Sequence, residues 1–124
     1  MTARELRIGN YINPKFPMKV VNIFPDEVNA DFEGNEGDVF EFKNEDIEGV
    51  PIDEEWLLEL GIKDGFLKFN YSEMGLNIER AQSTNYWIIK IGYGNEFRPL
   101  VALKYRHQLQ NLYFSLTGEE LEFK

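Results

Sequence analysis

Arg106-His-Gln-Leu-Gln-Asn-Leu-Tyr-Phe-Ser-Leu-Thr-Gly118 is the stretch that decides the fold, and Glu-Glu-Leu-Glu-Phe-Lys124 follows it. An amphipathic helix is expected up to Thr117, because successive helical residues turn by about 100° and bring apolar side chains onto one face. These side chains are Leu109, Leu112, Tyr113 and Leu116. Gly118 supplies a helix stop. The chain then predicts a short closing strand through Leu121 and Phe123.

The opposite face of this helix carries the candidate site residues, which are His107, Gln110, Asn111 and Phe114. His107 is the one conventional acid–base group of the chain for neutral pH. One hypothesis is a polar pocket built on the first three of these side chains. The other is a helix buried on two sides, with its polar groups hydrogen-bonded to neighbouring loops. The sequence favours the second hypothesis, because it places no nucleophile beside His107.

Phe114 lies opposite the apolar face of the helix, so its ring must be buried by some other part of the chain or contact a partner. Within one small domain, the two halves of the chain could enclose the ring. Otherwise Phe114 marks a dimer or partner surface, as large exposed apolar groups often do.

The first fifty residues predict short strands separated by Gly- and Pro-rich turns. The expected strands are Glu5–Ile12 with a bend at Gly9, Met18–Phe24, Glu27–Phe32 and Val39–Lys43. This spacing indicates an antiparallel meander or a small SH3-like barrel. The polar connection Asn44–Val50 is the expected joint within a single domain of residues 1–124. It separates an N-terminal β half of about residues 1–50 from a C-terminal sheet–helix half of about residues 51–124.

A short helix and a second antiparallel sheet are expected after this joint, so the predicted fold class is α+β. Pro51–Gly61 has the signals of a helix, with Asp53 as N-cap and Gly61 as stop. The predicted strands are Gly65–Tyr71, Met74–Glu79, Tyr86–Gly92 and Pro99–Tyr105. The third of these is expected to be central, because it is apolar on both faces.

The composition of the chain excludes several classes of function but indicates no particular one. A net charge of −9 argues against direct nucleic-acid binding, which depends on clustered Lys and Arg. Zero cysteines exclude disulfides and thiolate chemistry. The chain has no apolar run of the ~20 residues that cross a membrane, and no secretory signal is expected, so a soluble, cytoplasmic protein is predicted.

The usual sequence signatures of enzymes are not found. The glycine pairs are not placed as phosphate loops, and no Gly-x-Ser-x-Gly element occurs. The acidic stretch 31–38 is out of register for a calcium loop. We therefore expect no enzymatic activity, no cofactor and no metal.

Three stretches in order along the chain resemble a known family. They are Glu5-Leu-Arg-Ile-Gly-Asn10, Pro51-Ile-Asp-Glu-Glu-Trp-Leu-Leu58 and His107-Gln-Leu-Gln-Asn-Leu-Tyr-Phe-Ser-Leu-Thr-Gly-Glu-Glu-Leu121. In them the chain is similar to small uncharacterised proteins of gut Bacteroidetes and of the phages and prophages that infect them. The resemblance implies an origin and no mechanism, because the family carries no established activity and hence no catalytic residues.

These observations leave several functions open. The first hypothesis is a non-enzymatic protein-interaction or self-associating module of phage or mobile-element origin, whose partner is an unknown protein or a second copy of the chain. The alternatives are an acidic nucleic-acid mimic, suggested by the charge of −9, or a small-ligand binder that uses the face of the final helix. No membrane partner is expected.

Overall fold

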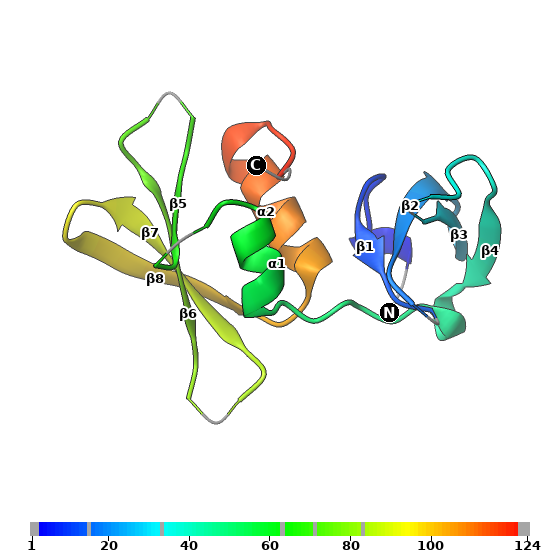
Figure 1. Ribbon diagram of the computed structural model, residues 1–124, viewed down its shortest axis with the longest axis horizontal. Helices are drawn as coiled ribbons and strands as arrows, with labels where there is room; N and C mark the ends of the chain where they lie inside the picture. Colours follow the sequence, from blue (N-terminus) through cyan, green and yellow to red (C-terminus); the bar gives the residue numbers. More distant parts are fainter. Residues whose placement is uncertain are drawn as a thin grey trace. The chain divides into compact units, whose positions relative to one another are not determined.

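The computed structural model describes residues 3–14, 16–32, 34–62, 64–70, 72–82 and 84–121, and these form an α+β protein (Figure 1). The chain divides into two compact units. The first unit comprises Met1–Val50 and Tyr105–Asn111, and the second comprises Pro51–Lys104 and Leu112–Lys124. The first boundary therefore falls at the end of the predicted joint.

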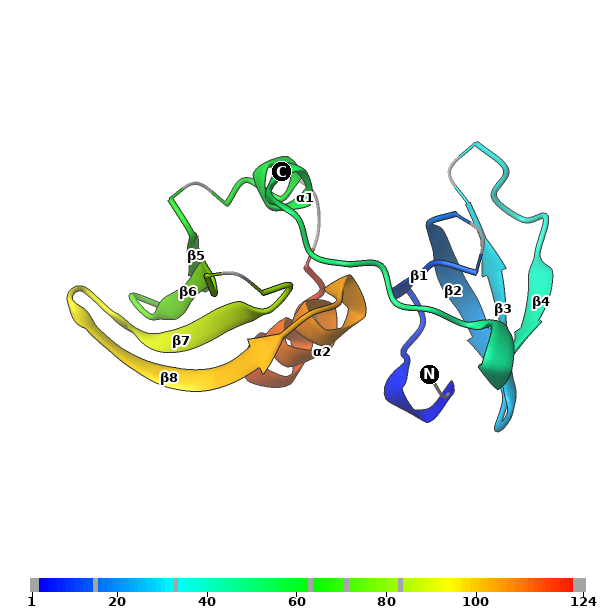
Figure 2. The same cartoon turned by 90° about the horizontal axis from the view of Figure 1, so that it is seen from below.

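The first unit contains a curled, four-stranded antiparallel half-barrel (Figure 2). Its strands, in the order β1-β2-β3-β4, are β1 (Tyr11–Ile12), β2 (Met18–Ile23), β3 (Glu27–Asp31) and β4 (Phe40–Lys43). Two 3-10 helices, η1 (Ala3–Glu5) and η2 (Asn44–Asp46), flank them. The predicted meander is confirmed, since each strand pairs with the next.

Alternation along these strands builds the core of the first unit. Val28 and Ala30 of β3 are fully buried, as their spacing of two predicts, and Val20 of β2 lies opposite Ala30. The register of β2 and β3 shifts between Val20 and Asn22. A bulge of this kind bends a strand and increases its twist, which helps to curl the sheet.

The first predicted strand was wrong over most of its length. Only Tyr11–Ile12 pairs as a strand, whereas Ala3–Glu5 is helical and Gly9 makes a turn with φ of +92°. The reason is that this backbone is hydrogen-bonded by other means. Arg7 N–H donates to Asn10 Oδ1 at 2.6 Å, and Gly9 N and Asn10 O both bond the backbone of Val20. Further partners come from the far end of the chain, as described below.

The second unit contains helix α1 (Glu54–Glu59) and a sheet in the order β5-β6-β7-β8. Its strands are β5 (Phe66–Lys68), β6 (Gly75–Arg80), β7 (Trp87–Tyr93) and β8 (Glu96–Leu103). Strand β7 is an interior strand, as predicted. Trp87 and Ile89 face its core, whereas Ile88 and Lys90 on the other face are only half-buried.

The ends of helix α1 follow the sequence signals. Asp53 accepts a hydrogen bond from Trp56 N at 2.8 Å and caps the N-terminus. Gly61 follows the helix with φ of +79°, and Ile62 N donates back to Leu57 O at 3.0 Å. This left-handed residue is the predicted glycine stop.

The final helix, α2 (Arg106–Thr117), also forms as predicted, and Gly118 ends it with φ of +74°. Arg106–Asn111 belong to the first unit and the remaining turns to the second. Leu109 and Tyr113 are buried, but Leu116 is 40% exposed, so the predicted apolar face does not continue to the helix end. Residues 119–121 form no strand, and 122–124, where the rest of the closing strand was expected, lie outside the described residues.

Candidate functional site

The polar side chains of helix α2 in the first unit face the loop of residues 5–11. His107 and Gln110 are buried and Asn111 is half-buried. The spacing of three and four residues places them on one side of the helix. The two stretches that meet here, 5–10 and 107–111, lie about a hundred residues apart in the sequence.

Gln110 hydrogen-bonds the loop with both atoms of its amide. Its Nε2 donates to Gly9 O at 3.1 Å, and its Oε1 accepts from Tyr11 N at 3.0 Å. The same oxygen accepts a longer bond of 3.4 Å from Asn10 Nδ2. Gln110 thereby satisfies backbone groups that strand pairing does not reach.

Asn111 extends this network to the loop's charged residues. Its Oδ1 accepts from Arg7 Nη1 and from Asn10 Nδ2, each at 2.9 Å. Its Nδ2 donates to Glu5 O at 3.0 Å. Both polar atoms of each amide therefore bond the loop, which gives the two side chains a positioning role.

His107 has one ring nitrogen bonded and one not. Its Nε2 donates to Glu5 Oε1 at 3.2 Å, and its ring stacks on Tyr105 with centroids 5.8 Å apart. Burial lowers the pKa of His107 below its ordinary value of 6.5, while the bond to Glu5 acts in the opposite direction. Nδ1 is buried without a hydrogen-bond partner among the described residues.

The structure thus brings three of the four predicted site residues together. Phe114 lies in the part of the helix that belongs to the second unit and is 39% exposed. Together the buried imidazole, its carboxylate partner and the two amides tie the first turns of helix α2 to the loop of residues 5–11. In the described ranges, no three His, Asp or Glu side chains gather in a way that could hold a metal ion.

One feature of the sequence was missed in the interpretation above: the excess of acidic residues is concentrated in one segment of the chain. Ten of the 22 acidic residues lie between Asp26 and Glu48, together with one of the 13 basic residues, Lys43. Acids and bases are equal in number elsewhere, so this acidic segment carries the entire net charge of −9. Counting charge by segment would have revealed it.

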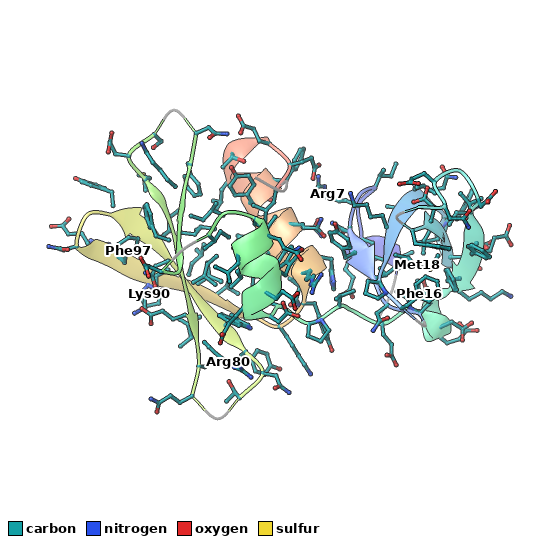
Figure 3. The ribbon with its side chains drawn as sticks, viewed as in Figure 1. Arg7, Phe16, Met18, Arg80, Lys90 and Phe97 are labelled. Carbon is teal, nitrogen blue, oxygen red and sulfur yellow. The ribbon has the colours of Figure 1, made fainter. Side chains whose placement is uncertain are left out.

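An aromatic cluster in the first unit adjoins this acidic segment. The Phe16 and Phe32 rings meet edge to face with centroids 5.1 Å apart, and Phe32 stacks on Phe40 at 6.2 Å. Phe32 packs on the core, whereas Phe16 and Phe40 are each 46% exposed. Phe16, labelled in Figure 3, precedes buried Met18 of β2 by two residues.

The loop between Phe32 and Phe40 is acidic, and its backbone is held by the carboxylates of Asp31 at the end of β3 and of Glu36 within the loop. Asp31 Oδ2 accepts from Gly37 N at 3.2 Å, and Glu36 Oε2 accepts from Gly34 N at 3.1 Å. Because the loop begins at one ring and ends at another, Glu36 and Asp38 lie at the same end of the sheet as the cluster. We call the aromatic cluster together with Glu36 and Asp38 the acidic aromatic surface.

Comparisons of the chain with protein-family models, with curated proteins and with solved structures found no match. None of the helices in the described part of the chain has the length and apolar character needed to span a bilayer. The function is therefore inferred from the residues of the chain itself.

Proposed function

We propose that this chain is a non-enzymatic protein-interaction module whose partner presents a basic segment to the acidic aromatic surface. The observation that carries the proposal is that the segment holding the whole net charge contains the exposed ring of Phe40, which belongs to one aromatic cluster with Phe32 and the exposed ring of Phe16. A solvated acidic loop needs no such rings beside it. Exposed apolar groups with a rim of one charge are typical of partner surfaces.

Carboxylates and aromatic faces recognise the same kind of group. Carboxylates attract Lys and Arg from a distance and increase the rate of encounter. The negative face of an aromatic ring then binds the cation at short range, and the ring covers the aliphatic stem of the same side chain. The combination supports a basic partner more strongly than either feature alone.

A titration of the isotopically labelled full chain tests this proposal. The probes are an Arg- and Lys-rich extended peptide and the same peptide with every basic residue replaced by Gln. The basic peptide is expected to shift the NMR signals of Phe16, Phe32 and residues 34–41, and the Gln peptide is not. Equal shifts with both peptides, or shifts spread over both units, would contradict the proposal.

Charge variants sharpen the test. Glu36→Gln with Asp38→Asn should weaken binding of the basic peptide roughly threefold to tenfold, since each exposed ion contact contributes up to about 1 kcal/mol. The matched control is Glu73→Gln with Glu96→Gln, which removes the same charge from exposed positions of the second unit. Equal weakening by both pairs would show that net charge alone drives the binding.

The concentrated charge also favours a second candidate, an acidic nucleic-acid mimic that occupies a DNA-binding protein. Mimicry of phosphates depends on carboxylates and not on rings, so Phe16→Ser should leave it unchanged. The interaction proposed above should instead weaken with that substitution. Competition between the chain and duplex DNA for a basic DNA-binding domain, measured for both variants, separates the two functions.

Self-association is the other form of an interaction module. Size-exclusion chromatography with light scattering measures it directly. A mass of two chains that persists in high salt would point to a second copy as the partner and count against the basic segment, because attraction of exposed charges is screened by salt.

Two further parts of the hypothesis differ in their support. A small-ligand site on the final helix has less support than the interaction surface, because the amides of Gln110 and Asn111 bond the loop. A phage or mobile-element origin rests on the sequence resemblance alone.

A further inference from the structure

A second surface, within the second unit, has the features of a small binding site. A cleft of about 240 Å³ opens between helix α1 and the sheet. Its apolar lining includes Leu57 and Ile62 on the helix side and Ile78 and Trp87 on the sheet. Glu54 and Asp64, both exposed, are the charged residues of its lining. This cleft is independent of the acidic aromatic surface and of the function proposed for it.

The sides of this cleft are held in place by hydrogen bonds. Trp87 Nε1 donates to Ile52 O at 3.1 Å, which fixes the indole ring. Ile78 N donates to Gly65 O at 2.7 Å on the opposite side. Gly65 has φ of +73°, and an added Cβ there would lie 2.6 Å from Ile78 O, so only glycine permits this close approach. A cleft with fixed sides is preformed, which lowers the entropy lost on binding.

The chemistry at the mouth of the cleft selects a cation. Arg80 places its guanidinium 6.0 Å from the Trp87 ring and 4.0 Å from Glu54 Oε1. A cation of the chain itself, which is not part of the lining, thus already lies near both the ring and an acid of the lining. The Asp64 carboxylate makes no ion pair with the described residues, and so remains available to a second cation.

The volume limits the size of the ligand. Sites for drug-sized molecules measure roughly 300–1,000 Å³, so this cleft is slightly smaller than that range. It fits one aromatic ring or a short alkyl chain, with a charged group left at the mouth.

We propose that this cleft binds a small amphiphilic amine, with its apolar body against Leu57, Ile78 and Trp87 and its ammonium group against Asp64. Asp64 is the recognition residue, and Glu54, the other acid of the lining, is paired with Arg80. A ligand with a single ring gains little total free energy, so a dissociation constant on the order of millimolar is expected.

The test compares three probes that share one ring: 2-phenylethylamine, 2-phenylethanol and phenylacetate. Each is titrated into the full chain while the Trp87 indole N–H and the Leu57 and Ile78 methyl groups are followed by NMR. The amine should saturate most tightly, the alcohol several-fold more weakly, and phenylacetate should give no saturable shift. Equal affinity for amine and carboxylate, or shifts that avoid these groups, would overturn the proposal.

Asp64→Asn is the decisive variant. Asp64 has φ of +56°, and asparagine is one of the residues that tolerate this left-handed backbone, so the turn should be retained. The variant should weaken amine binding roughly threefold to tenfold and leave alcohol binding unchanged, since one exposed charge contact is lost. Glu59→Gln, an exposed acid of α1 outside the cleft lining, is the matched control. If both variants behave alike, the ammonium is not recognised by Asp64 and the proposal fails.

Discussion

The two sheets of this protein have the same number and order of strands, yet they are stabilised by different means. In the first unit β1 has two residues and β4 four, so pairing alone satisfies little backbone. The deficit is met by Gln110 and Asn111, which bond a loop far away in the sequence. In the second unit β6, β7 and β8 have six to eight residues, and buried Trp56 and Trp87 supply the core. The backbone around short β1 therefore depends on side-chain hydrogen bonds from α2, whereas β6, β7 and β8 depend on their own ladders.

The twelve residues of helix α2 combine both means of stabilisation, which are polar side chains that bond a loop and apolar side chains buried in a core. Its first turns bury the polar residues His107 and Gln110, and its later turns bury Tyr113. A helix that buries polar groups at one end is not a simple amphipathic helix. Substitutions that affect one unit and spare the other therefore test the comparison directly.

The largest effect is expected from Trp56→Ala in the second unit. Trp56 is 1% exposed and is the largest of the fully buried side chains, so the cavity should lower the free energy of unfolding by about 3–5 kcal/mol. Urea denaturation measures the loss. Leu58→Ala, on the exposed side of the same helix, is the control and should change stability by less than about 0.5 kcal/mol. A loss below 1 kcal/mol for Trp56→Ala would show that the second unit does not depend on this side chain.

The second effect in size is expected from Gln110→Ala in the first unit. Gly9 O and Tyr11 N would lose their partners, and the loss of unfolding free energy should be about 2–3 kcal/mol. Hydrogen exchange should show faster exchange at Tyr11 N–H, with the amides of β7 less affected.

Gln108→Ala is the matched control for that substitution. Gln108 lies on the same helix, and its Oε1 accepts from Tyr105 N at 2.9 Å. Losing this local contact should reduce stability by about 1 kcal/mol. If the two glutamines give equal losses, the long-range bonds of Gln110 add nothing beyond a local cap.

Signals from neighbouring residues predict most of the secondary structure. They do not predict contacts between residues far apart in the sequence, as the comparison of the two units shows. Strand β3 and helix α1 could be predicted from the sequence, because the alternation in Glu27–Asp31 and the capping residues of α1 depend only on neighbouring residues. Residues 5–10 were assigned to a strand because their pattern contains no information about residues 107–111. Leu116 shares a helical face with buried Leu109 and Tyr113, so the sequence predicts that it is buried. The helical angle predicts which face a side chain occupies, but not whether another element covers that face.

The candidate surfaces show the same limit. The charge of the acidic segment can be counted in the sequence, whereas the contacts among Phe16, Phe32 and Phe40 depend on the curl of the first sheet. The cleft beside α1 depends on Gly65 approaching β6, a long-range contact that no neighbouring residue reveals. The sequence marks His107 as the lone histidine, but its partner Glu5 could be found only in the folded chain.

A smaller effect is expected from Asp53→Ala, which removes the cap of α1. Trp56 N would lose its 2.8 Å bond, and loss of an N-cap usually reduces stability by about 1 kcal/mol. Glu55→Gln, which leaves the cap intact, is the control. A loss as large as that of Gln110→Ala would mean that the second unit depends on polar contacts as much as the first.

The smallest effect is the pH dependence caused by His107. Because burial lowers its pKa in the folded state below 6.5, the unfolded chain binds the proton more readily, and stability rises with pH through this range. The stabilising contribution is complete above about pH 6.5 and is lost as the pH falls toward the lowered folded-state pKa. Urea midpoints measured between about pH 5 and 8 should therefore fall toward the acid side in the native chain more than in His107→Gln. A steeper fall in the variant, or a native chain that gains stability on acidification, would mean that the bond to Glu5 outweighs burial.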